Sequence, residues 1–194
     1  MEGKSKSDRK TRGIIPRMVE NVFKYIDESP DYIEFMVKVS ILEIYMEELR
    51  DLLDPKRKKN MKIRSDKHKG IYVEKLTEVY VSTPEEVFKF LKIGKKNRSV
   101  GRTNMNLVSS RSHLLVNLTL HQNDTKNEIA KNGKLLMVDL AGSEKVSKTK
   151  AEGKTFEESK QINQSLLYLG NVINALNEGK HVPYRNSQLT RLLE

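Results

Sequence analysis

Apolar residues fall into short blocks whose spacing predicts both helices and strands. Between Gly13 and Ile26 they keep a three- and four-residue spacing, which is typical of a helix with one buried face. From Ile33 to Ile41, and again from Leu114 to Leu120, apolar and polar residues alternate, as they do in a strand with one buried face. The run Leu135–Val138 is apolar at every position and indicates a central strand that is covered on both faces.

The blocks between these elements predict shorter structure. We expect a helix over Glu43–Leu53, because its leucines share one side and Asp54-Pro55 would end it. Two short strands are expected over residues 71–73 and 79–81. Thr83, followed by Pro84 and then by Glu86 three residues after the threonine, marks the start of a helix that runs to about Arg98.

The last part of the chain predicts two helices. A long helix carries an apolar stripe from Ile162 to Leu176 and ends at Gly179, and Ser187 is placed to cap a final helix. Because helices and strands are interspersed along the chain, the predicted fold class is α/β. No internal repeat is visible.

Composition limits the classes of protein further. With 194 residues the chain has the length of one domain. It has no cysteine, which excludes a disulfide scaffold, a thiolate zinc site and thiol catalysis. The formal net charge of +10 favours a polyanionic partner, namely nucleic acid, an anionic membrane or an acidic protein surface. Residues 1–12 are mostly charged or small, and we expect a disordered or loop-like start there.

No segment resembles a targeting or membrane signal. No apolar stretch follows Met1, and the longest run without charge, residues 161–177, is too short and too polar to cross a bilayer. We therefore expect an intracellular protein without membrane insertion. Aromatic residues make up 6% of the chain and no nucleic-acid motif is present, so nucleic-acid binding is not expected.

The first candidate for chemistry follows the apolar run. Asp139 ends it and Gly142 comes three residues later. In nucleotide hydrolases an acidic residue at the end of such a strand holds Mg²⁺ directly or through water, and a glycine lets the backbone N–H approach a phosphate. The simpler alternative is a strand followed by a tight turn.

The second candidate is the segment Asn106–His113. Its three serines flank Arg111 immediately before a predicted strand. Hydroxyl groups are ligands for Mg²⁺, and a guanidinium pairs with phosphate or carboxylate. A hydrophilic loop is the simpler alternative, and His113 by itself is more typical of a strand-start residue that is satisfied by a neighbour than of a catalytic group.

A phosphate-binding loop of the form GxxxxGK[ST] does not occur in these 194 residues. Gly153-Lys154-Thr155 has the required ending, but Lys148 stands where the first glycine would be. Gly3-Lys4-Ser5 also has the ending, and only two residues precede it.

Taken together, the two candidate segments resemble a known family. NxxSSRSH at residues 106–113 and DLAGSE at residues 139–144 are similar to switch I and switch II of the kinesin motor domain. GIIPR (13–17), EIY (43–45), RDLL (50–53), GNVINAL (170–176) and VPYRNSQLTRLL (182–193) also resemble that family, so the similarity extends from Gly13 to the last residues. SEKVSKT (143–149) and NMN (104–106) resemble conventional kinesin heavy chains most.

The resemblance implies a P-loop NTPase-like α/β fold with a mostly parallel central sheet flanked by helices, here incomplete, and a site for ATP and Mg²⁺. It implies that Ser109, Ser110 and Asp139 contact Mg²⁺ or the γ-phosphate region, Ser110 directly and Asp139 through water. It further implies that the Gly142 amide senses the γ-phosphate and that Asn106 positions nucleotide or water. Arg111 and Glu144 would form the ion pair that closes the two switches around the hydrolytic water.

A second implication of the resemblance is a surface for microtubules. The residues expected on it are Lys75, Lys145, Lys148, Tyr184, Arg185 and Arg191. The expected location is then the cytoplasm, on the microtubule cytoskeleton. A homodimer would need segments, such as a coiled coil, that are not among these residues.

Departures from the family pattern leave two hypotheses open. Met1-Glu2-Gly3 resembles the stretch that follows the family's phosphate loop, and Val108, Lys150 and Gln188 replace residues common in the family. The first hypothesis is a partial motor domain, residues 13–194, from an ATP-driven microtubule motor, which by itself lacks ATPase activity. The second is a microtubule-binding module without an ATP cycle.

Overall fold

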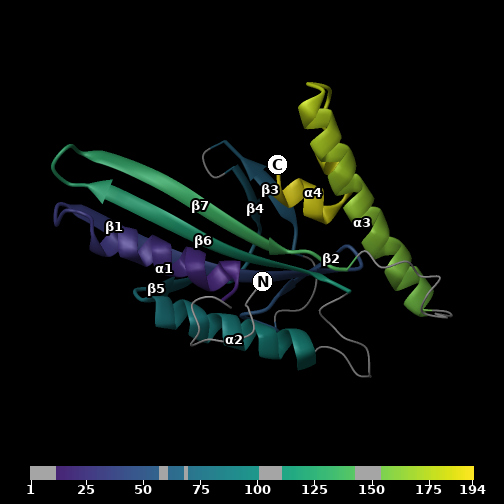
Figure 1. The fold of residues 1–194 in the computed structure, drawn as a ribbon, viewed down its shortest axis with the longest axis horizontal. Coiled ribbons are helices and arrows are strands. Elements are labelled where there is room, and N and C mark those ends of the chain that lie inside the picture. Colours follow the sequence, from purple (N-terminus) through teal and green to yellow (C-terminus); the bar gives the residue numbers. More distant parts are fainter. Residues whose placement is uncertain (1–11, 57–60, 68–69, 101–110, 143–153) are drawn as a thin grey trace.

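The computed structural model describes residues 12–56, 61–67, 70–100, 111–142 and 154–194. A five-stranded sheet forms the centre, with the strand order β2-β1-β6-β7 and with β5 paired to β1 beside β2 (Figure 1). The strands are β1 (Ile33–Tyr45), β2 (Glu48–Asp51), β5 (Val79–Val81), β6 (His113–Asp124) and β7 (Ile129–Asp139). The strands β3 (Ile63–Asp66) and β4 (Gly70–Val73) form a separate hairpin.

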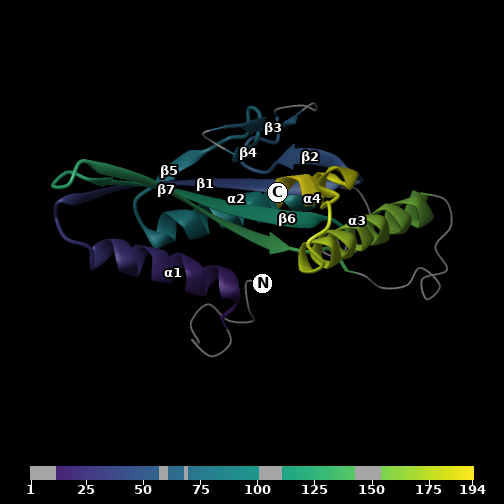
Figure 2. The same cartoon turned by 90° about the horizontal axis from the view of Figure 1, so that it is seen from above.

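Helices lie on both sides of this sheet and at its end. They are α1 (Ile14–Asp27), α2 (Pro84–Val100), α3 (Lys154–Asn177) and α4 (Gln188–Leu192), with the 3-10 helix η3 (Tyr184–Asn186) before α4. Seen along the sheet, α1 and the β3–β4 hairpin lie on opposite sides of it (Figure 2).

Most of the expected elements are confirmed. They are the helices at residues 13–26, 83–98 and 162–179, the helix capped by Ser187, and the short strands at residues 71–73 and 79–81. The expected disordered or loop-like start at residues 1–12 lies, except for Arg12, outside the described residues.

The alternation of β1 and β6 separates two apolar clusters. One face of the sheet packs against α1 and α2 through residues such as Val39, Val116 and Leu118. The opposite face packs against α4 and the β3–β4 hairpin through Leu42 and Leu115. Because successive side chains of a strand point to opposite faces, each strand contributes to both clusters.

The expected helix over Glu43–Leu53 is wrong. Residues up to Tyr45 continue β1, and β2 returns along it, with Tyr45 opposite Glu48. Met46 and Glu47 both have positive φ, as the two central residues of a type I′ hairpin turn do. Residues 43 and 44 also pair with β6, so the long ladder between β1 and β6 overrides the helical spacing of the leucines.

Two expectations about the sheet also need correction. Every strand pair among the described residues is antiparallel, so the mostly parallel sheet expected from the resemblance is wrong for this part of the chain. A short turn joins β6 to β7, and such a connection permits only an antiparallel pair. Leu135–Val138 does contribute to both apolar clusters, but β7 pairs only with β6 among the described residues and is the outer strand there, not a central one.

A groove lies on the face of the sheet that carries the β3–β4 hairpin. It has a volume of about 580 Å³ and is lined mainly by residues of β1, β6 and β7, among them Ser40, Asn117 and Thr119. Lys134 crosses it, since its Nζ donates a hydrogen bond to the carbonyl of Ile71 on β4 at 3.0 Å. Burial lowers the pKa of Lys134, while nearby Glu78 acts in the opposite direction.

Candidate functional site

The register of β6 and β7 brings the two candidate segments together. β6 begins at His113, two residues after Arg111, and β7 ends at Asp139. Leu114 lies opposite Asp139 in the antiparallel ladder. The end of the 106–113 segment and the start of the 139–144 segment therefore meet at one end of the sheet, although they are far apart in the sequence.

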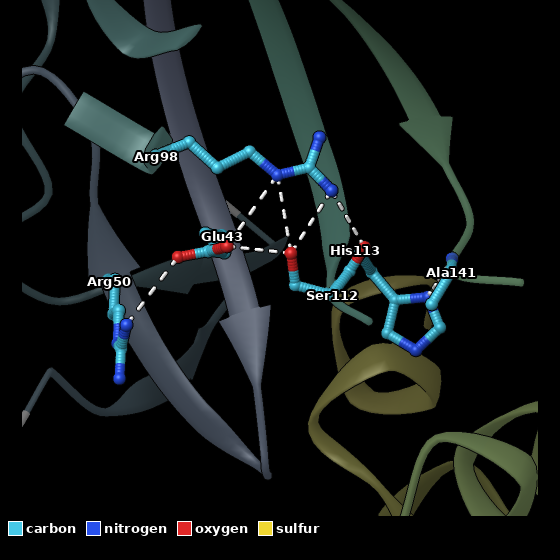
Figure 3. Close-up of polar contacts among 6 residues, drawn as sticks. All are labelled: Glu43, Arg50, Arg98, Ser112, His113 and Ala141. Atoms are coloured by element: carbon cyan, nitrogen blue, oxygen red, sulfur yellow. Dashed lines mark hydrogen bonds and ion pairs between the residues drawn. The ribbon is translucent and has the colours of Figure 1, made fainter. Parts of the chain in front are cut away.

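His113 joins these segments directly (Figure 3). The backbone N–H of Ala141 donates a hydrogen bond to His113 Nδ1 at 3.1 Å. On the other side of the ring, Nε2 lies 2.8 Å from Oγ of Ser165 in α3. The imidazole is 3% exposed. One buried side chain thus connects β6, the segment after β7 and α3, which confirms that His113 starts a strand and is satisfied by neighbours.

The environment keeps this imidazole neutral. Burial, with a smaller contribution from the positive charge of Arg98, lowers the pKa of His113 to about 4. Since Nδ1 accepts a hydrogen bond, the neutral ring carries its proton on Nε2. That proton points to Ser165.

The neighbouring Ser112 points to the opposite face of the sheet and belongs to a buried polar network (Figure 3). Its hydroxyl donates to Glu43 Oε1 at 2.6 Å. Arg98 of α2 donates to the carbonyl of Ser112 at 2.9 Å and lies 3.5 Å from Glu43 Oε1. Arg50 on β2 lies 3.8 Å from the other carboxylate oxygen of Glu43. The network fixes the backbone directly after Arg111 to β1 and α2.

One residue in the sequence, Glu43, could have indicated this network, although it lies within a run of apolar residues. Glu43 interrupts an otherwise apolar stretch, since Ile41, Leu42 and Ile44 surround it. A carboxylate that is 1% exposed needs a buried partner of opposite charge. Arg98 could not be paired with it from the sequence, because the two residues meet only when α2 packs against β1.

Several predicted nucleotide-site residues lie outside the described part of the chain. These are Asn106, Ser109, Ser110 and Glu144. Of the others, Asp139 ends β7 and Gly142 follows three residues later, and both are half-buried. Arg111 lines a small recess together with His113 and residues 161, 162 and 165 of α3. The structure therefore places Arg111 and Asp139 at the same end of the sheet, while the expected pair of Arg111 with Glu144 stays a prediction.

At the end of β7, the described residues offer some of the oxygen ligands that Mg²⁺ prefers. Among the described residues no group of three or more His, Cys, Asp or Glu side chains is arranged to hold a metal ion. Asp139 carries hard carboxylate oxygens that would contact Mg²⁺ through water, and Mg²⁺ in nucleotide sites is commonly held by one or two protein oxygens together with waters and phosphates. The site fits that mode of binding and not an all-protein cage.

The predicted microtubule-surface residues that the structure describes lie around α4 and the β3–β4 hairpin. Lys75 follows β4 and is exposed, and Tyr184 and Arg185 belong to η3. Arg191 of α4 donates a hydrogen bond to the carbonyl of Ile63 on β3 at 3.4 Å, which ties the hairpin to the helix. Lys145 and Lys148 lie outside the described residues.

Local contacts fix α4 in this position. Ser187 and Thr190 form a capping box, in which Ser187 Oγ accepts from the Thr190 N–H at 3.1 Å. The N–H of Gln188 donates to Glu47 Oε2 at 2.7 Å, so the turn between β1 and β2 also holds the start of α4. Burial raises the pKa of Glu47, and the hydrogen bond from Gln188 opposes that rise.

Comparisons with known proteins agree with this arrangement. The family model described as the kinesin motor domain matches residues 1–194. A kinesin heavy chain of Syncephalastrum racemosum is 55% identical over 196 residues, which cover 100% of this chain and 21% of that protein. The human kinesin-1 heavy chain is 50% identical over 195 residues, covering 100% of this chain and 20% of its own length.

A solved structure of a fast kinesin superposes with a TM-score of 0.87 at 51% identity, covering 100% of this chain and 55% of that one. The chain belongs to the kinesin motor domain family, whose P-loop NTPase-like α/β fold it shares. It spans about a fifth of the length of the two curated relatives. In the part of the chain that the structure describes, no helix has both the length and the apolar character needed to span a membrane.

Proposed function

We propose that this chain is part of the motor domain of an ATP-dependent microtubule motor. The observation that carries the proposal is the hydrogen bond from Ala141 to His113, because it joins the two segments that resemble the nucleotide-sensing switches of the family. A motor needs such a junction, since a change at a bound phosphate must reach both segments together.

The proposed nucleotide site combines Ser109, Ser110, Asp139 and Gly142. Ser110 and, through water, Asp139 would hold Mg²⁺, and the Gly142 amide would approach the γ-phosphate. Arg111 and Glu144 would pair across the two segments, with Asn106 positioning nucleotide or water. Hydroxyl and carboxylate oxygens are suited to Mg²⁺, and a glycine amide is suited to a phosphate oxygen.

We expect that the 194 residues by themselves do not hydrolyse ATP. The pattern GxxxxGK[ST] does not occur in them, and that loop supplies the backbone amides and the lysine that bind the β-phosphate. A microtubule-stimulated ATPase assay on the purified chain tests this expectation, and measurable turnover would contradict it.

The proposed microtubule surface consists of Lys75, Lys145, Lys148, Tyr184, Arg185 and Arg191. Basic side chains on one surface favour an acidic partner such as tubulin, which agrees with the net charge of +10. The proposed location is the cytoplasmic microtubule cytoskeleton, with neither nucleic acid nor membrane as a partner.

Co-sedimentation with stabilised microtubules tests the surface. Reversing the charges of Lys75 and Arg185 to glutamate should weaken binding at least about ten-fold at low salt, because two favourable charge contacts become repulsive. The matched control reverses Lys89 and Lys92, which are exposed on α2 and so belong to the other side of the sheet. Equal losses from both double variants would contradict the proposed surface.

A microtubule-binding module without an ATP cycle is the second candidate. It is favoured by the same lack of a GxxxxGK[ST] pattern in these residues. The two candidates differ in nucleotide response. Binding that is the same with ADP, with a non-hydrolysable ATP analogue and without nucleotide favours the module, whereas a difference favours the motor.

A further inference from the structure

The helix α3 has an unusual connection to the rest of the molecule. It packs mainly against α4 and η3, and it stands at the end of the central sheet, not across its face (Figure 1). Ser165 lies in the middle of this helix and is 3% exposed. Its contact with His113 Nε2 at 2.8 Å is a polar link from α3 to the sheet.

The hydrogen bonds around Ser165 all run in one direction. Ala141 N–H donates to His113 Nδ1, the protonated Nε2 donates to Ser165 Oγ, and Ser165 Oγ donates to the carbonyl of Ile162 at 2.7 Å. In this series Nδ1 accepts, Nε2 donates, and the Ser165 hydroxyl accepts one hydrogen bond and donates another. If the ring changed to the other tautomer, Nδ1 could no longer accept from Ala141.

We propose that His113 is a positioning residue that couples α3 to the segment after β7, through the hydrogen bond of its imidazole to Ser165. Removing the hydroxyl of Ser165 leaves Nε2–H buried without its acceptor, so the ring loses the contact that fixes its orientation, while the Ala141 N–H still selects the Nε2–H tautomer. The hydrogen bond from the Ala141 amide to Nδ1 is then weakened, although Ser165 and Ala141 are not themselves hydrogen-bonded.

The consequence for a motor rests on the proposed function. If the segment at Ala141 responds to nucleotide, His113 transmits that response to α3, and by reciprocity a force on α3 reaches Ala141. The coupling itself is a property of the folded chain and is measured without nucleotide or tubulin.

The test is amide hydrogen exchange by NMR on the whole 194-residue chain, together with the ¹⁵N shifts of the His113 ring. In Ser165→Ala, exchange of the Ala141 amide should become about five-fold faster, as expected for one hydrogen bond of ordinary strength. The ¹⁵N shift of His113 Nε2 should also change, because this N–H loses its acceptor, while the ring stays in the Nε2–H tautomer. Ser165→Thr keeps the hydroxyl and should restore both signals.

Two further variants separate coupling from general destabilisation. Ser29→Ala is the control, because Ser29 follows the C-cap of α1 and its Oγ donates to the carbonyl of Tyr25 in the same helix at 2.7 Å, a local bond that joins no distant elements. His113→Asn keeps an acceptor near Ala141 but does not reach Ser165. In that background, Ser165→Ala should have no further effect on exchange of the Ala141 amide, since both changes remove the contact between His113 and Ser165.

The outcomes are distinct. Faster exchange at Ala141 with unchanged exchange in the β1–β6 ladder, and recovery in Ser165→Thr, supports the proposal. An unchanged exchange rate of the Ala141 amide in Ser165→Ala would overturn it, as would an equal increase at every amide. Failure of the proposed function is read separately, from a wild-type chain that does not sediment with microtubules.

Discussion

The two faces of the central sheet are built from the same strands but differ in what they hold. The face toward α1 and α2 is a continuous apolar cluster, with the network of Glu43, Arg98 and Ser112 at one end. The face toward α4 and the β3–β4 hairpin has a smaller apolar cluster, a groove of mixed polar and apolar lining and the His113 link to α3. The first face holds the strands together, and the second joins them to α3, α4 and the β3–β4 hairpin.

The largest expected effect is on the first face. Glu43→Gln removes the negative charge that lies 3.5 Å from the buried Arg98 guanidinium and should lower the free energy of unfolding by about 3–5 kcal/mol. Urea denaturation measures it. Glu34→Gln is the control, because Glu34 is also on β1 but is exposed, where it accepts a hydrogen bond from the Asn123 side-chain amide. It should change stability by less than about 0.5 kcal/mol. Similar losses in both variants would show that the buried Glu43 carboxylate contributes no more to stability than an exposed one.

The next effect compares neighbouring residues of β6 that point to opposite faces. Leu118→Ala removes a fully buried side chain from the first face and should cost about 3 kcal/mol. Thr119→Ala opens no large apolar cavity and removes the acceptor of an Asn117 hydrogen bond, so it should cost about 1 kcal/mol. Thermal or urea unfolding checks the order, and a larger loss at Thr119 would reverse the comparison.

A pH effect is expected on the second face. The ordinary pKa of His113 is 6.5 and burial lowers it to about 4, so between these values the unfolded chain binds a proton that the folded chain does not. The folded state therefore keeps its full stability at pH values above 6.5, where the His113 ring is neutral in both states. It loses stability as the pH falls from there toward 4, because only the unfolded chain takes up the proton. Between pH 7.5 and pH 5 the loss should be about 2 kcal/mol. Denaturation of wild type and of His113→Asn at both pH values measures it, and an equal pH dependence in the two proteins would contradict the assignment.

The smallest effect is at the start of α4. Ser187→Ala removes the acceptor of the Thr190 N–H and should cost about 1 kcal/mol. Ser187→Thr keeps a hydroxyl at the cap and should recover most of that loss. Denaturation midpoints of the three proteins provide the measurement, and an unaffected Ser187→Ala would mean that the bond of Gln188 to Glu47 holds α4 by itself.

Much of the local structure could be predicted, because the signals are carried by neighbouring residues. The helix after Gly13, the helix after Thr83 and the cap at Ser187 all have sequence patterns that a few residues define, and all three are confirmed. The tract 43–53 failed because its leucine spacing fits a helix, whereas pairing with β6, about seventy positions away in the chain, decides its structure. No local pattern contains that information.

For the candidate site, too, the sequence predicted the motifs, whereas the tertiary structure decided how they meet. The motifs at residues 106–113 and 139–144 point to the family, which the comparisons confirm, and they contain Arg111 and Asp139. Their meeting through Ala141 and His113 follows from the β6–β7 register, and the partners Glu43, Arg98 and Ser165 come from three other elements.

By itself, then, the sequence determined the family, the chemical types at the site and most helix boundaries, because these depend on residue identity and short-range spacing. The tertiary structure alone decided which face each strand residue serves, that the described strands are all antiparallel, and that one neutral imidazole links three segments. The physical reason is that burial and hydrogen-bond partners are properties of contacts between distant residues, and these contacts exist only once the strands and helices have packed.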